Sequence, residues 1–90
     1  MNENLKQELL KSMLDFEHKD KVIVRFQEDF AICDQSDCLR VEFETAACKL
    51  ADYWRPIAFK YGMFVMKPKW YDGGLRIAFG CEHGRHIKIV

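Results

Sequence analysis

The sequence predicts an α+β fold in which two helices pack on one face of an antiparallel sheet. Two segments, residues 5–16 and 38–61, repeat apolar side chains every three or four positions, as amphipathic helices do. The segments between and after them alternate apolar and polar side chains, as half-buried strands do. The chain has 90 residues, 49% of them apolar, which suits one domain with one core. We therefore expect a single α+β domain over residues 1–90 with the order α-β-β-α-β-β-β.

The first helix is predicted by four apolar residues on one helical face, Leu5, Leu9, Met13 and Phe16. Asn4 is the expected N-cap, because an asparagine side chain accepts hydrogen bonds from the free N–H groups of the first turn. After this helix, residues 22–26 and 30–33 read as strands on either side of a polar segment, residues 27–29. We expect a β-hairpin there, with a turn that contains no glycine.

The segment 38–61 supports two interpretations at its start. Leu39, Val41 and Phe43 alternate like a strand, but a longer apolar series recurs at helical spacing: Leu39, Phe43, Ala46, Ala47, Leu50, Trp54, Ile57 and Tyr61. We favour the helix, because its series continues for more than about five turns. Asp37 is then the expected N-cap and Gly62 the expected end. Pro56 has no backbone N–H, so this long second helix should be kinked near Pro56.

The last third of the chain predicts a three-stranded meander over residues 63–67, 75–79 and 85–90. Glycines mark the two turns between these strands. Within the second strand, Leu75, Ile77 and Phe79 should face the core. Pro68 cannot donate a backbone hydrogen bond, so the end of the first strand should lie at a sheet edge or at a bulge.

Charge is segregated along the chain. Residues 1–44 contain six lysines and arginines against eleven aspartates and glutamates, and residues 45–90 contain eight against three, so the halves carry −5 and +5. A cluster of cations and aromatic residues lies on or beside one predicted hairpin of the basic half: Lys60, Lys67, Lys69, Trp70, Tyr71 and Arg76. Cations neutralise phosphates, and flat rings stack on unpaired bases. The leading hypothesis is a small binding or regulatory module that engages nucleic acid through this basic aromatic hairpin.

The acidic half suggests an alternative partner of the opposite charge. Glu28, Asp29, Asp34 and Asp37 lie in and just after the predicted hairpin. Acidic loops of this kind can imitate phosphates and dock on a nucleic-acid-binding protein, as a phage-type inhibitor or regulator would. The opposite charges of the two halves also permit a homodimer in which the acidic face of one copy meets the basic face of another.

A structural zinc site is a third hypothesis. Zinc takes four cysteine or histidine ligands, commonly supplied as two close pairs. Cys33 and Cys38 form one pair, and Cys81 with His83 or His86 forms a second. Cys33, Cys38, Cys81 and His83 would bind zinc if the two loops converged. Buried thiols and surface histidines are the more common interpretation, because a chain with this apolar content folds without a metal.

Catalytic and membrane functions find little support in the sequence. It contains no nucleophile elbow, no zinc-protease motif and no glycine-rich phosphate loop. A domain of this size has little room for a ligand pocket of roughly 300 Å³ or more, so we expect a non-enzymatic protein. No apolar stretch is long enough for a signal peptide or a membrane span, so we expect a cytoplasmic location and no membrane partner.

Overall fold

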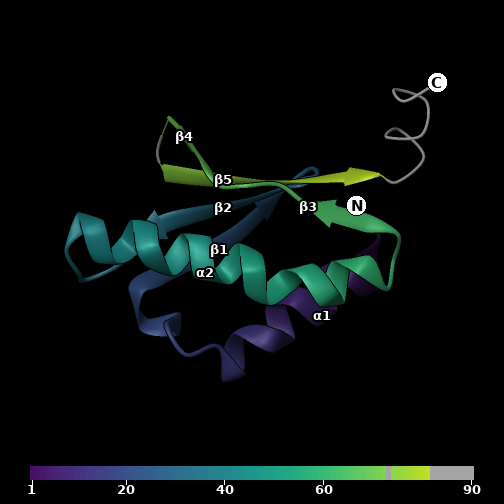
Figure 1. Cartoon of the computed structure of the whole chain (residues 1–90), viewed down its shortest axis with the longest axis horizontal. Helices are drawn as coiled ribbons and strands as arrows, with labels where there is room; N and C mark the ends of the chain where they lie inside the picture. The colour runs from purple at the N-terminus through teal and green to yellow at the C-terminus, as the bar shows by residue number, and fades with distance from the viewer. Residues whose placement is uncertain (73, 82–90) are drawn as a thin grey trace.

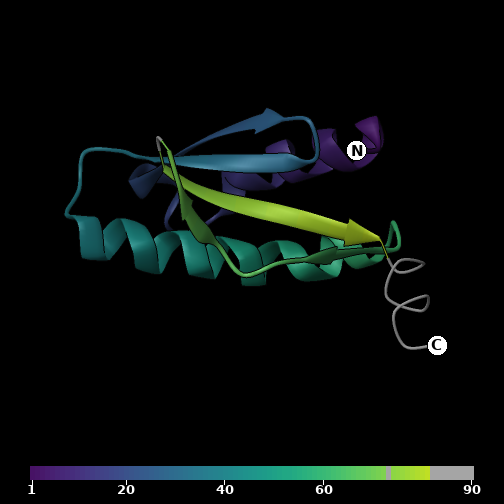
Figure 2. The ribbon, with the colours of Figure 1, turned by 90° about the horizontal axis from the view of Figure 1, so that it is seen from above.

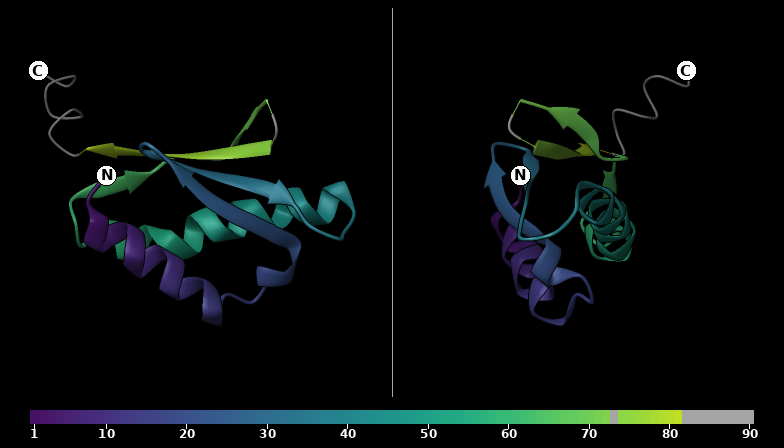
Figure 3. Two further views of the ribbon diagram at one scale, coloured as in Figure 1. Left: turned by 180° about the vertical axis from the view of Figure 1, so that it is seen from behind. Right: turned by 90° about the vertical axis from the view of Figure 1, so that its left-hand side faces the viewer.

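The computed structural model describes residues 1–72 and 74–81 and confirms the α+β class. In chain order the main elements are α1 (Glu3–Ser12), β1 (Val22–Gln27), β2 (Phe30–Gln35), α2 (Arg40–Phe59), β3 (Met63–Val65), β4 (Lys69–Tyr71) and β5 (Gly74–Cys81). Two short 3-10 turns, Met13–Asp15 and Lys19–Lys21, connect α1 to β1. Both helices lie on the same face of the antiparallel sheet (Figures 1 and 3). The strand expected over residues 85–90 lies outside the described residues.

Helix α1 begins two residues earlier than the sequence suggested. Its N-cap is Asn2 and not Asn4, because the Asn2 side chain accepts hydrogen bonds from the backbone N–H groups of Asn4 at 2.7 Å and Leu5 at 3.3 Å. Asn4 therefore lies inside the first turn as a donor. Leu5 and Leu9 are fully buried, as the helical period predicted.

Strands β1 and β2 form the predicted hairpin. Gln27 pairs with Phe30, which leaves a two-residue turn at Glu28 and Asp29. Glu28 has a φ of 54°. A positive φ is what the type I′ and II′ hairpin turns require at their first central position. The chain therefore places a non-glycine residue in a left-handed conformation to close the hairpin.

Helix α2 confirms the helical interpretation from Arg40 onward. Leu39 has an extended conformation and is the N-cap, and it is exposed where the apolar series placed it in the core. Asp37 lies outside the cap. The carboxylate of Glu42 caps the helix instead, because it accepts a 3.1 Å hydrogen bond from the backbone N–H of Leu39. Pro56 lies inside the helix, which continues past it to Phe59.

The sheet has the strand order β1-β2-β5-β3. Strand β4 pairs with the same edge of β5 as β3 does, because β2 occupies the opposite edge (Figure 2). Strand β5 is therefore central, and its two ends contact different neighbours. This arrangement differs from the predicted three-stranded meander, in which one unbroken strand preceded the turn.

A β-bulge separates β3 from β4. Val65 lies opposite Phe79 and Lys69 lies opposite Arg76, so the three residues 66–68 face the two residues 77–78. The backbone N–H of Met66 still donates to the carbonyl of Ala78 at 2.8 Å, which places the extra residue at 67–68. Pro68, which the sequence placed at a sheet edge or at a bulge, lies in this bulge. The missing N–H of proline breaks no hydrogen bond between strands at that position.

The core lies between the helices and the sheet. Leu75, Ile77 and Phe79 face it from β5, as predicted, and Leu50 is fully buried on α2. Trp54 is the largest fully buried side chain. Its ring stacks on that of Phe26 with a centroid separation of 5.9 Å, which joins α2 to β1.

Candidate binding surface on the uncovered face of the sheet

The sheet face turned away from the helices carries a mixed polar and aromatic surface. Side chains opposite one another on paired strands share a face, so the pairs Arg25 with Ile32 and Ile32 with Arg76 lie on the face opposite the core. We call this side the open face; its residues from β1, β2, β4 and β5 include Ile23, Arg25, Phe30, Ile32, Asp34, Lys69, Tyr71 and Arg76. Neither α1 nor α2 covers it (Figures 1 and 3).

Arg76 lies between two aromatic rings at the centre of the open face. Its guanidinium carbon is 4.2 Å from the ring centroid of Tyr71 and 4.4 Å from that of Phe30. Tyr71 lies on β4, Arg76 lies on the neighbouring strand β5, and Phe30 lies on β2, on the other side of β5. Both distances are within the range of cation–π attraction, so the rings hold the guanidinium in place. Tyr71 remains 39% exposed, which leaves part of its ring available to a ligand.

Two further cations flank this stack. Lys69 lies directly opposite Arg76 on β4 and is exposed. Arg25 donates to the carboxylate of Asp34 at 3.1 Å, across the β1–β2 pair. The open face thus combines three cations with one carboxylate, and two aromatic rings contact the guanidinium of Arg76.

Trp70 lies on the other face of the sheet. It is opposite Leu75, a core residue, and its ring packs on Phe43 of α2 with a centroid separation of 6.0 Å. The guanidinium carbon of Arg40 is 4.3 Å from the Trp70 ring centroid, so the indole is held against the start of α2. Trp70 is 47% exposed, but successive strand residues alternate between faces, which separates it from Tyr71.

Lys60 and Lys67 also lie apart from the open face. Lys60 follows α2 and forms an ion pair with Glu8 of α1, whose carboxylate accepts a second hydrogen bond from the Tyr61 hydroxyl at 2.9 Å. The hydrogen bonds from Lys60 and Tyr61 lower the pKa of the Glu8 carboxyl. Lys67 lies in the bulge. Of the six residues that the sequence grouped, the structure brings together Lys69, Tyr71 and Arg76.

The four acidic residues are divided between the two ends of the β1–β2 hairpin. Glu28 and Asp29 occupy the turn, where Asp29 pairs with the ammonium group of Met1 at 2.6 Å. Asp34 is five residues further along β2, or about 16 Å at the usual rise per strand residue. Asp37 follows in the loop before α2. The structure therefore does not gather these acids into one patch.

The proposed zinc ligands do not converge in the described residues. Cys33 lies opposite Leu75, and Cys81 is six residues further along β5, about 20 Å away at the strand rise. Two ligands of one zinc ion lie within about 4 Å of each other, so Cys33 and Cys81 cannot share one. Cys33 is also buried against the helices, which raises its pKa to about 12. His83 and His86 lie outside the described residues; within residues 1–72 and 74–81, no three Cys, His, Asp or Glu side chains are grouped to hold a metal.

Phe30 and Arg25 are residues of the open face that the sequence did not indicate. Phe30 begins β2, and its neighbours Ala31 and Cys33 are buried on the helix side. The alternation of the hairpin therefore contained a signal that Phe30 points outward. The contact of Phe30 with Arg76 had no such signal, because it depends on the pairing of β2 with β5, whose paired residues are more than forty positions apart in sequence.

Comparisons of the chain with protein-family models, curated proteins and solved structures found no match. In the part of the chain that the structure describes, neither helix has the length and apolar character needed to cross a membrane. The functional argument consequently rests on the geometry of the surface.

Proposed function

We propose that this chain is a non-enzymatic binding module that engages single-stranded nucleic acid on the open face of its sheet. The observation that carries the proposal is the Tyr71–Arg76–Phe30 stack on a face that neither α1 nor α2 covers, with Lys69 and Arg25 on the same face. The sequence predicted that the whole basic aromatic hairpin binds nucleic acid. The present proposal retains only those hairpin residues that lie on the open face, Lys69, Tyr71 and Arg76.

The chemistry of the open face suits a flexible anionic polymer with flat bases. An exposed ring such as Tyr71 offers a stacking surface to any base, and each stacked base contributes about 1 to 3 kcal/mol. Arg76 is already held by two rings, so it loses little side-chain freedom when it contacts a phosphate. Lys69 supplies a second phosphate contact from the neighbouring strand.

A single strand fits this surface better than a duplex does. The bases of a duplex are stacked on one another, so their flat sides are closed to protein rings. Duplex reading usually requires a helix or a two-stranded ribbon that enters the major groove, whereas the open face is a broad sheet surface. Docking of a basic protein through the acidic loops has less support, because Asp29 and Asp34 lie at opposite ends of β2.

Fluorescence anisotropy with labelled twelve-nucleotide oligothymidine and oligouridine tests the proposal. About three phosphate contacts, from Arg25, Lys69 and Arg76, give a log–log slope of affinity against salt of roughly −2. Tyr71→Ala should weaken binding by about 1 to 3 kcal/mol and leave that slope unchanged, because a ring displaces no ions. Lys69→Ala should make the slope less steep by about 0.7, one phosphate contact.

The matched controls lie on the helix side of the molecule. Trp70→Ala removes a comparably exposed aromatic ring, and Lys49→Ala removes an exposed cation of α2. Neither should change affinity by more than about twofold, and the melting temperature of every variant should be measured on the same sample. Absence of binding by the wild type at about 50 mM salt, or an equal loss in Trp70→Ala and Tyr71→Ala, contradicts the proposal.

A further inference from the structure

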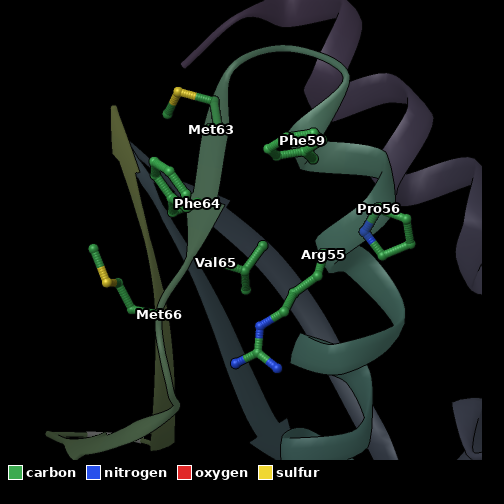
Figure 4. Close-up of a pocket in the computed structure, with 7 residues that line it drawn as sticks. All are labelled: Arg55, Pro56, Phe59, Met63, Phe64, Val65 and Met66. Carbon is green, nitrogen blue, oxygen red and sulfur yellow. The ribbon is translucent and has the colours of Figure 1, made fainter. Parts of the chain in front are cut away.

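A second surface lies at the other end of the sheet, between the C-terminal half of α2 and the outer strand β3. It is a groove of about 440 Å³ with mainly apolar walls (Figure 4). Phe59 and Arg55 line it from α2, and Met63, Val65 and Met66 line it from β3 and the residue that follows. Phe59 is 64% exposed, whereas the other phenylalanines of the chain are buried or partly buried. The groove is also larger than we expected of a domain this small.

The groove runs beside backbone groups that can accept another strand. The N–H of Met66 donates to Ala78 of β5, and hydrogen-bonding direction alternates along an antiparallel strand. Met63 and Val65 therefore point their N–H and C=O groups away from β5, toward the outer edge of the sheet. β3 is the last strand in the sheet order, and within residues 1–72 and 74–81 no strand pairs with that edge. Exposed strand edges of this kind serve as templates for strand addition.

The charge of this edge indicates the chemistry of its occupant. Residues 59–71 include no aspartate or glutamate, and Lys67 is the lysine of this segment that neither pairs with Glu8, as Lys60 does, nor lies on the open face, as Lys69 does. Lys67 is the second residue after β3 and is exposed, and the Arg55 side chain borders the groove (Figure 4). Arg55 pairs with Asp52 on the helix surface, a weak interaction at this exposure. The same edge of a second copy would bring no acidic residue to Lys67, so the complementary partner is a different chain.

We propose that the groove and the free edge of β3 bind an extended peptide segment of a partner protein, with acidic residues at one end of a run of alternating apolar side chains. The backbone of the peptide would pair with Met63 and Val65, its apolar side chains would contact Phe59, and its acidic end would lie beside Lys67. This site is separate from the open face, so it adds a protein partner to the proposed nucleic-acid ligand.

The structure also indicates a direction for the peptide. β3 runs from Met63 toward Lys67, so an antiparallel partner has its amino-terminal end beside Lys67. Antiparallel pairing is slightly more stable per residue than parallel pairing. A peptide with its acidic residues at the amino-terminal end should therefore bind more tightly than one with the same residues at the carboxyl-terminal end.

Fluorescein-labelled ten-residue peptides provide the probes. One has three aspartates followed by alternating valine and threonine, one has the reverse order, and one replaces the second valine of the first with proline. The first should bind most tightly. The proline peptide should bind at least about tenfold more weakly, because proline lacks the N–H that strand addition uses. Equal binding of the proline peptide, or no binding of the first peptide at about 1 mM protein, overturns the proposal.

Paired variants locate the contact. Phe59→Ala should weaken binding of the first peptide about fivefold or more, whereas Leu14→Ala, at a residue of α1 that is 69% exposed, should leave it unchanged. Lys67→Glu should weaken binding more at low salt than at high salt, and Lys49→Glu should not. Tyr71→Ala should have no effect on peptide affinity, which separates this site from the open face.

Native mass spectrometry tests the competing occupant, a second copy of the chain. The proposal expects the wild type and Phe59→Ala to have the same copy number at micromolar concentration. A wild-type dimer that Phe59→Ala converts to a monomer would assign the groove to self-association and overturn the proposal.

Discussion

The indole N–H of Trp54 donates a 3.0 Å hydrogen bond to the hydroxyl of Ser12, which joins the middle of α2 to the end of α1. The same serine accepts a second 3.0 Å hydrogen bond through its backbone carbonyl, from the hydroxyl of Tyr53. Trp54 is fully buried, so its N–H has no access to water, and Ser12 is the partner that lets a large indole enter the core.

We expect Ser12→Ala to destabilise the protein by about 1 to 3 kcal/mol, because it leaves the buried N–H of Trp54 without an acceptor. Urea titration followed by circular dichroism measures the change. In a Trp54→Phe background the same serine substitution should cost clearly less, since phenylalanine has no donor to leave unpaired. Equal costs in both backgrounds would show that the hydrogen bond to Trp54 does not account for the effect.

Leu50→Ala should lower the free energy of unfolding by about 2 to 5 kcal/mol, because Leu50 is fully buried and its removal leaves a cavity among well-packed neighbours. Lys49→Ala, at the adjacent exposed position, is the control and should change stability by less than about 0.5 kcal/mol. Chemical denaturation of both variants tests the assignment of the buried helical face. A loss at Leu50 as small as that at Lys49 would contradict it.

Glu8 should contribute a stability that disappears in acid. Its pKa in the folded chain is lowered from 4.5 by hydrogen bonds from Lys60 and Tyr61, so the unfolded chain binds a proton more readily. The stabilisation is therefore complete above about pH 4.5 and is lost as the pH falls through the lowered value. The melting temperature of Glu8→Gln should fall less than that of the wild type over this range, because glutamine does not titrate there. Parallel acid-dependence in the two proteins would exclude this contribution.

Cys33 and Cys48 should differ in their reactivity toward iodoacetamide at neutral pH. Cys33 is fully buried with a pKa raised to about 12, so it has on the order of a thousandfold less thiolate than an ordinary cysteine, while Cys48 is exposed on α2. Peptide mass mapping should find Cys48 modified in the native protein and Cys33 modified only after denaturation. Early modification of native Cys33 would show that the strand it occupies opens readily.

Periodicity predicted the elements better than it predicted their ends. Leu5, Leu50 and Ile77 are buried as their spacing indicated, because a period of three to four or of two residues determines which side of an element is apolar. The caps were assigned to Asn4 and Asp37, but Asn2 and Glu42 satisfy the free N–H groups. Several nearby polar residues can cap the same helix, and the choice between them depends on where the first turn packs.

For the candidate binding surface, too, the sequence predicted some features and missed others. The sequence grouped Lys69, Tyr71 and Arg76 because they lie on or beside one predicted hairpin, and the structure places Lys69 and Tyr71 on β4, next to Arg76 on β5. It also included Trp70, which the sheet turns toward Phe43 and Arg40, and Lys60, which Glu8 holds beside α1. A linear cluster of charged and aromatic residues contains no information about which face each residue occupies until the register of the strands is known.

The sequence by itself determined the α+β class, the two amphipathic helices and the first hairpin, and it limited Pro68 to a sheet edge or a bulge. These features depend on short periods and on the local chemistry of single residues, which act within a few positions along the chain. Only the tertiary structure decided that β2 pairs with β5, which brings Phe30 to Arg76 and leaves the outer edge of β3 beside Phe59. Pairing between distant strands has no local signature, because it is selected by how the whole chain buries its apolar surface.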